Sequence, residues 1–405
     1  MYKVASIYFK IGHLAAEEGL PQKAIAYMDS VLFLLDESPE NSKDKILLLE
    51  YLLDKSIAIE AYQKRGDAFV QKGELYKAHN DFNNIILLTN YLRDHYIDSE
   101  SKLLSINRLR PVYEKAATTA WNLHKNEANN TYKLSIFNYA EHSKSALLNE
   151  NSRKVRNKDT EGGTGSSKEL LQKEETYIVQ IDQCKEHILE AKKEQNKEKE
   201  ALYLQKMLLL EQELDAFEQH LQETYPSYRS WDHGRDSVVS PQEVQAHLAA
   251  DELFIEYFIS ENHFFVIYIT KEVVKIKEIP SFELAVFNDK IRKLRRSLSN
   301  VSFIIQQEKE AYELFCSTAH WLYNNCLKDD LLIDKKHLII VPDRDFHYVP
   351  FEVLLTKPTN NEGIDYQNLP YLIQDYAIHY EYSAAIMVNN KRKVNTANGK
   401  ILGFA

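Results

Sequence analysis

The chain has 405 residues, which predicts two or three domains, and its 11 Gly and 10 Pro are too few for the turns of a β-sandwich or barrel. A formal net charge of −10 argues against non-specific nucleic-acid binding, which needs a basic surface. No apolar run approaches the roughly 20 residues of a membrane-spanning helix. The only cysteines, Cys184, Cys316 and Cys326, cannot form a disulfide framework, so we expect a cytoplasmic protein.

Two stretches near the start repeat one pattern of small and bulky residues. Four pairs of positions share an offset of 54: Gly12 and Gly66, Gly19 and Gly73, Ala24 and Ala78, and Met28 and Phe82. Small residues at helix crossings let two backbones approach closely, and the bulky ones fill the layer between neighbours. The pattern resembles tetratricopeptide (TPR) helix pairs, although the offset exceeds their usual length of about 34 residues. The alternative is two generic amphipathic hairpins.

A third, fainter unit follows the first two. Its first helix is predicted around Tyr113–Ala120 and its second over Tyr132–Leu148. Three units are about the minimum for a stable solenoid. We therefore predict a TPR-like α-solenoid over residues 1–150, with a groove that binds a protein or peptide partner.

Two further regions precede the last domain. Residues 151–167 are polar and glycine-rich at their end, which predicts a flexible linker. Residues 168–224 contain neither Gly nor Pro, and they carry heptad-spaced apolar residues: Leu171, Ile178, Ile181 and Ile188, then Met207, Leu210, Leu214, Phe217 and Leu221. Two antiparallel helices with a turn near Lys192–Glu200 fit best. One long helix or an intermolecular coiled coil is the alternative.

The last part of the chain, residues 236–405, has strand and helix periodicity. Strands are predicted at Leu253–Ile259, Phe264–Ile269, Val273–Ile279, His337–Pro342, Asp375–Tyr382 and Lys400–Ala405. Helices are predicted near Phe282–Ser297 and Glu308–Leu327. Strands that alternate with helices indicate an α/β domain with parallel pairs, so the predicted fold class is α plus α/β.

A possible nucleophile is Cys316, which stands one helical turn before His320, with Cys326 ten residues beyond it. A cysteine nucleophile needs a nearby base and an electropositive niche. Phe315, Trp321 and Leu322 surround the pair instead, and the spacing supplies only two metal ligands. We interpret this cluster as core.

The densest polar segment follows the strand His337–Pro342. Its Asp343, Asp345, His347 and Glu352 could form a metal or acid–base set at the carboxyl end of a strand. The interleaved prolines and aromatics favour a structural turn.

A basic run lies on the helix predicted after the third strand. It consists of Lys290, Arg292, Lys293, Arg295 and Arg296. Because stacking aromatics are not interleaved with it, we expect a solvated or partner-facing surface and no nucleic-acid site.

Several segments, in chain order, resemble bacterial TPR–CHAT proteins, in which TPR repeats accompany a caspase-like domain. The most specific are His337–Leu355 (HLIIVPDRDFHYVPFEVLL) and Leu369–Ala385 (LPYLIQDYAIHYEYSAA), which are similar to that family's PDG-x-L-x-x-x-PF-E-x-L and YLI-x-DYAI-x-Y-x-x-S signatures. Supporting matches are Tyr139–Leu148, Tyr225–Tyr228 and Gln242–Ile259. Arg344 stands where the family prefers Gly, which puts the shape of that turn in question.

The resemblance implies that residues 236–405 are the amino-terminal portion of a CHAT domain, with the fold of caspase- and separase-like cysteine peptidases. In that family the catalytic His and Cys follow strands that come after the segment matched by Ile401–Ala405. Both are therefore expected beyond Ala405, and this chain is expected to be inactive. No catalytic residue, cofactor or metal ligand is carried over.

Two functions remain open at this point. In the first, the repeats recruit a partner for a caspase-like peptidase. The alternative is a non-enzymatic TPR adaptor with a degenerate CHAT domain. The sequence specifies neither the substrate nor the activating signal.

Overall fold

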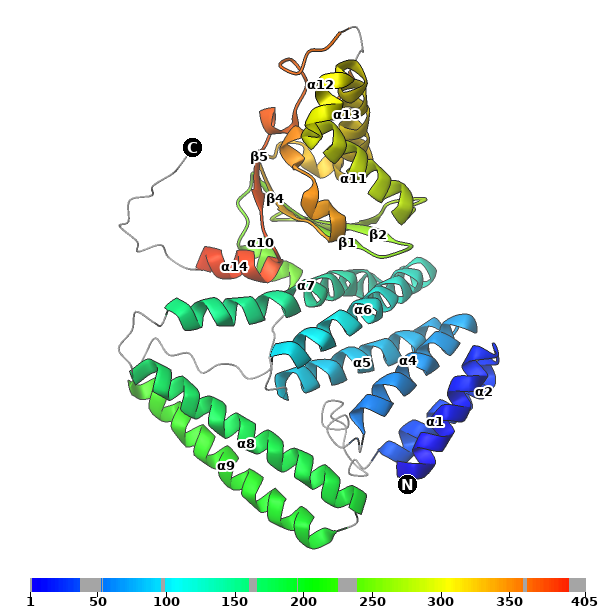
Figure 1. Ribbon diagram of the computed structural model, residues 1–405, viewed down its shortest axis with the longest axis vertical. Coiled ribbons are helices and arrows are strands. Elements are labelled where there is room, and N and C mark those ends of the chain that lie inside the picture. The colour runs from blue at the N-terminus through cyan, green and yellow to red at the C-terminus, as the bar shows by residue number, and fades with distance from the viewer. Residues whose placement is uncertain are drawn as a thin grey trace. The chain divides into compact units, whose positions relative to one another are not determined.

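The computed structural model describes residues 2–36, 52, 54–95, 99–159, 166–194, 196–224, 239–359 and 363–392. The chain divides into two compact units: Met1–Tyr132 with Ala146–Ser237, and Lys133–Ser145 with Val238–Ala405. The first is built from helices, whereas the second holds a mixed sheet and its covering helices (Figure 1). The predicted combination of an α and an α/β part is confirmed.

The first unit begins with two consecutive helix pairs. They are α1 (Tyr2–Glu17) with α2 (Pro21–Leu35), and α4 (Lys55–Gln71) with α5 (Leu75–His95). Residues 37–51 and 53, between the two pairs, lie outside the described residues. Helix α4 starts only at Lys55, where the Asp54 side chain accepts a hydrogen bond from the Ile57 N–H.

The repeated glycines have matching roles in the two helix pairs. A Cβ at Gly12 would lie 2.8 Å from Cβ of Tyr27, and one at Gly66 would lie 2.9 Å from Cε1 of Phe82. Side chains at these two positions would force the paired helices apart. Gly19 and Gly73 both have positive φ, +71° and +75°, in the turn that joins the two helices of a pair. The offset of 54 therefore relates two equivalent helical hairpins, as the sequence predicted.

The next two helices are longer than predicted. Helix α6 covers Ser99–Glu127, and α7 covers Asn130–Asp159. The predicted linker over 151–167 is therefore wrong at both ends, because α7 continues to Asp159 and α8 begins at Ser166. Residues 151–159 contain no Gly or Pro, so nothing in their sequence interrupts the helix. Gly162, Gly163 and Gly165 lie outside the described residues.

The predicted antiparallel hairpin is formed by α8 (Ser166–Glu194) and α9 (Lys197–Thr224). Ile181 and Cys184 of α8 pack against Leu210 and Leu214 of α9, and Tyr177, Tyr203 and Met207 flank this core. The side chain of Asn196 accepts a hydrogen bond from the Lys199 N–H and caps α9. The alternative of one long helix is therefore wrong.

The second unit contains a five-stranded sheet in the order β3-β2-β1-β4-β5. The strands are β1 (Glu252–Ile259), β2 (Phe264–Ile269), β3 (Val274–Glu278), β4 (His337–Val341) and β5 (Ala377–Tyr380). The first three form an antiparallel meander, and β1, β4 and β5 are parallel. All five lie where the sequence predicted strands. The sixth predicted strand, Lys400–Ala405, lies outside the described residues.

Both faces of β1 are buried, which explains its continuous apolar sequence. On one face Leu253, Ile255 and Tyr257 join the core with residues of α11 (Leu284–Ser299) and α13 (Glu308–Leu322). Short helix α12 (Val301–Gln306) links those two. The opposite face carries Phe254, Glu256 and Phe258, all fully buried. Here the Lys133–Ser145 segment of α7 reaches the sheet, together with α10 (Pro241–Ala246) and α14 (Ala384–Arg392).

Candidate functional site

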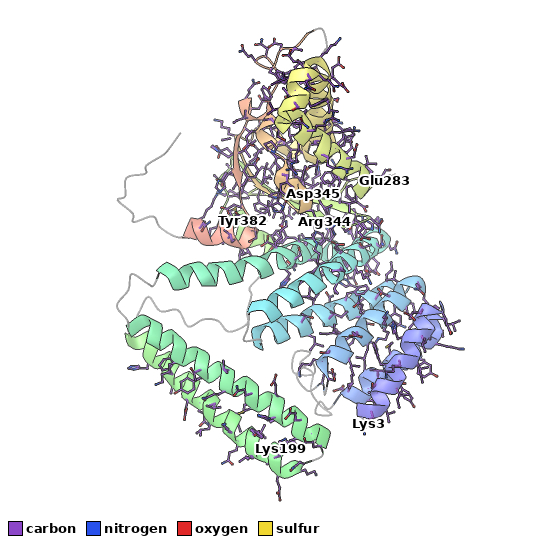
Figure 2. The ribbon with its side chains drawn as sticks, in the orientation of Figure 1. Lys3, Lys199, Glu283, Arg344, Asp345 and Tyr382 are labelled. Atoms are coloured by element: carbon purple, nitrogen blue, oxygen red, sulfur yellow. The ribbon has the colours of Figure 1, made fainter. Side chains whose placement is uncertain are left out.

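The polar segment after β4 forms a turn whose side chains bond in different directions. Asp343 is buried and accepts a hydrogen bond from the Ile259 N–H at 2.7 Å, which ties the end of β1 to β4. His347 bonds through Nδ1 to the Arg344 carbonyl at 2.8 Å, and Tyr380 donates to Glu352 at 2.7 Å. Asp345, which Figure 2 labels beside Arg344, is exposed. Three of the four candidate acid–base residues therefore serve separate bonds and the fourth is exposed, as in a structural turn.

Arg344 adopts the backbone conformation that glycine favours. Its φ is +50°, within the left-handed region. The question that the sequence raised about this turn is answered, since the turn keeps a glycine-type conformation with arginine in place.

Replacing Arg344 tests the strain in this turn directly. Arg344→Ala and Arg344→Gly both remove all side-chain atoms beyond Cβ. The difference between their free energies of unfolding therefore reports the cost of the positive φ at this position. We expect the Gly variant to be more stable than the Ala variant by about 1 kcal/mol in urea unfolding. At Asp345, where φ is not positive, the same pair should show the reverse order. Equal stabilities of the two Arg344 variants would contradict the strain.

The cysteine–histidine pair of α13 lies in the core. Cys316 is 3% exposed and Cys326 is 1% exposed, and burial raises the pKa of both thiols. His320 bonds through Nδ1 to the Leu355 carbonyl at 3.1 Å. Because a nucleophilic cysteine needs a lowered pKa, this environment favours inert thiols.

The basic run on α11 is engaged with rings of its own unit. Arg295 stacks over Tyr348, Arg296 over Phe303 and Lys290 over Trp321. Lys293 also pairs with Asp289 at 2.7 Å. The aromatic rings that contact the basic run therefore come from other elements of the fold, and the spacing of the run itself does not reveal them.

A buried ionic cluster lies on the other face of the sheet. Lys144 of α7 donates hydrogen bonds to Oε1 of Glu256 at 2.8 Å and to the Tyr257 carbonyl at 2.7 Å. The Glu256 side chain is fully buried and that of Lys144 is 8% exposed. The carboxyl groups of Glu256 and Glu141 are electrostatic neighbours, and each affects the pKa of the other. We call Glu141, Lys144 and Glu256 the buried triad.

Glu141 connects the triad to the start of α14. Its two carboxylate oxygens accept hydrogen bonds from the N–H groups of Ala384 at 2.7 Å and Ala385 at 3.1 Å. The next N–H, of Ile386, donates to the side chain of Ser383. The first N–H groups of α14 are therefore satisfied by a side chain of α7 and by its own cap.

The environment of the triad opposes the ionisation of its two carboxyl groups. Burial raises the pKa of both, and the neighbouring Glu141 raises the pKa of Glu256 further. Against burial, the N–H groups of Ala384 and Ala385 lower the pKa of Glu141, and Lys144 lowers the pKa of both carboxyl groups. Lys144 is therefore the cation that compensates the two carboxyl groups of the buried triad.

Sequence reasoning missed the triad as a site. The one available signal was Glu256, a carboxyl group in the middle of the apolar stretch LFIEYFI. Its partner Lys144 lies 112 residues earlier in the chain. No local spacing connects the two residues, so only the fold brings them together.

No family model matches the chain, and no curated protein matches it. Within the described residues, no three His, Cys, Asp or Glu side chains group as a metal site requires. None of the helices in this described part is long and apolar enough to cross a membrane.

Proposed function

We propose that this chain joins a partner-binding TPR region to the first part of a caspase-like CHAT domain. The protein or peptide partner would bind in the groove of the repeats. The peptidase chemistry of such a protein would use a thiolate that attacks the scissile carbonyl, with an imidazole beside it.

The observation that carries this proposal is that four segments that resemble the TPR–CHAT family lie in contact with one another in the structure. Tyr139–Leu148 supplies Glu141 and Lys144, and Gln242–Ile259 supplies Glu256. Leu369–Ala385 supplies the N–H groups that Glu141 binds, and His337–Leu355 supplies the Asp343 bond to β1. Three of the segments therefore meet at the buried triad, and the fourth bonds to the same strand, β1. Chance matches scattered along a chain have no reason to do so.

None of the chain's own thiols is offered as the nucleophile. Cys184, Cys316 and Cys326 are buried, and burial raises the pKa of each. A catalytic cysteine has the opposite environment, with a lowered pKa and partial exposure.

The product of the natural gene tests the proposal. We expect a thiol-reactive peptide probe to label it at a cysteine other than these three. A variant with Cys184, Cys316 and Cys326 all changed to Ser should keep the labelling. Labelling that disappears in this variant would overturn the assignment. The 405-residue chain itself should show neither peptide cleavage nor site-specific labelling.

The buried thiols equally favour a second function, that of a non-enzymatic adaptor. Partner capture by the chain, together with a natural gene product that neither cleaves peptides nor reacts with the probe, would support the adaptor over the peptidase.

A further inference from the structure

Helix α1 carries an exposed apolar stripe. Val4, Ile7, Ile11 and Leu14 are 43%, 56%, 38% and 57% exposed. They are spaced by three, four and three residues, as the seam residues of a helix that packs on another helix are. We call these four residues the α1 stripe. Isolated apolar residues at a surface need no explanation, but a seam of four along one helix does.

The internal repeat shows what covers this face of a helix pair. At the offset of 54, the α1 stripe corresponds to Ala58, Ala61, Arg65 and Ala68 of α4. Ala58 and Ala61 are fully buried and Ala68 is 3% exposed. Met28, Val31, Leu32 and Leu35 of α2 share a core with Ala58 and Ala61. Helix α2 therefore covers on α4 the face that is exposed on α1.

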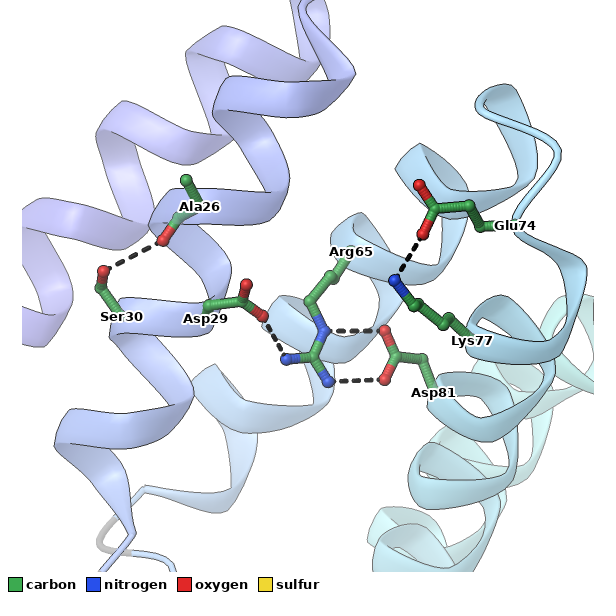
Figure 3. A network of polar contacts seen from close by, with 7 residues as sticks. All are labelled: Ala26, Asp29, Ser30, Arg65, Glu74, Lys77 and Asp81. Atoms are coloured by element: carbon green, nitrogen blue, oxygen red, sulfur yellow. Dashed lines mark hydrogen bonds and ion pairs between the residues drawn. The ribbon is translucent and has the colours of Figure 1, made fainter.

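The register between α2 and α4 is antiparallel and well defined. Arg65 binds Asp29 of α2 at 2.6 Å, and its other nitrogens bind Asp81 of α5 (Figure 3). Lys72, near the end of α4, donates to Gln22 near the start of α2, also at 2.6 Å. Residue numbers therefore rise along one helix as they fall along the other. The equivalent positions on α1 are Ile11 for Arg65 and Glu18 for Lys72.

We propose that the α1 stripe is a docking site for an amphipathic helix of a separate protein, which lies antiparallel to α1 in the register of α2 on α4. This helix has an apolar residue in place of Asp29, since it faces Ile11 and not Arg65. It has a basic residue in place of Gln22, since it faces Glu18 and not Lys72. Its positive N-terminal end also lies near Glu17 and Glu18, which adds favourable electrostatics.

A second copy of the chain fits this site less well. Helix α2 of another copy is already packed on its own α4, so it is not available. Two α1 helices could pair antiparallel through their stripes, but the exposed Lys10 lies beside Ile11 near the middle of the stripe. A twofold axis there would bring two Lys10 side chains together, and like charges oppose pairing. The proposal rests on the repeat geometry and is independent of the α/β unit.

A peptide derived from α2 tests the site. The probe is the chain's own segment Leu20–Asp36 with Gln22→Lys and Asp29→Leu, and the unchanged segment is the comparison. We expect fluorescence anisotropy to show that the full chain binds the altered peptide about tenfold tighter, after circular dichroism has verified that both are equally helical. Failure of the altered peptide to bind overturns the proposal.

A matched variant of the chain locates the binding. Ile11→Arg recreates on α1 the arginine that Asp29 meets on α4, so this variant should prefer the unchanged peptide. If Ile11→Arg alters neither affinity, the peptide binds elsewhere and the proposal is wrong. A chain that sediments as a dimer, and that Ile7→Lys converts to a monomer, would show that a second copy occupies the stripe and would also overturn it.

Discussion

Replacing Lys144 by Met is expected to lower the free energy of unfolding of the α/β unit by about 3–5 kcal/mol. Met has a similar length and no charge, so the substitution leaves little empty space. It removes the cation of the buried triad and leaves the carboxyl groups of Glu141 and Glu256 away from water without it. Urea unfolding, monitored by hydrogen exchange of peptides from β1, measures the free energy of unfolding at the strand that carries Glu256.

A second substitution separates a charge effect from a packing effect. Lys144→Met combined with Glu256→Leu removes both members of the ion pair and leaves Glu141 on the N–H groups of α14. This double variant should recover part of the lost stability, because an apolar pair replaces the buried Lys144–Glu256 ion pair, whereas Glu141 keeps its two N–H donors but not its cation. Lys133→Met, in the same segment of α7 but only half-buried, should change stability by less than about 0.5 kcal/mol. A double variant as unstable as Lys144→Met would show that the triad is not a coupled unit.

The sequence was most informative where burial is simplest. The strands of the α/β unit were predicted correctly because both faces of β1 and β2 are buried, which makes their sequences short, continuous and apolar. The repeat was visible because Gly12 and Gly66 each face a large side chain of the paired helix, and only a missing Cβ fits there. Both patterns are local in the sequence, because each residue type is set by the side chains packed directly against it.

The sequence was least informative where distant segments meet. The polar composition of residues 151–159 predicts a linker, although α7 continues through them without a breaking residue. The tyrosine that holds Glu352 comes from β5, and the lysine that holds Glu256 comes from α7. A single sequence gives the chemistry of such residues but not their partners. The partners of the polar residues therefore follow only from the contacts in the folded chain.

Changing Glu256 to Gln is expected to remove part of the pH dependence of the free energy of unfolding. Burial and the neighbouring Glu141 raise the pKa of Glu256 in the folded protein, whereas the unfolded carboxyl group has a pKa of about 4.3. Its contribution to stability is therefore fully present below about pH 4.3 and is lost as the pH rises toward the raised value. Gln cannot ionise, so the variant should gain stability relative to the wild type by up to about 1.4 kcal/mol per pH unit over that range.

Urea unfolding between about pH 4.5 and pH 9, repeated for both proteins, checks this difference. The matched control is Glu252→Gln on the same strand. Burial opposes ionisation there too, but hydrogen bonds from Lys391 and the Ala249 N–H outweigh it and lower the pKa of Glu252. That carboxylate stabilises the fold above its unfolded pKa, and this stabilisation is lost as the pH falls. The Glu252→Gln variant should therefore be less stable than the wild type at neutral pH, and the two stabilities should converge in acid. A stability difference for Glu256→Gln that stays flat with pH would show that folding does not raise the pKa of Glu256.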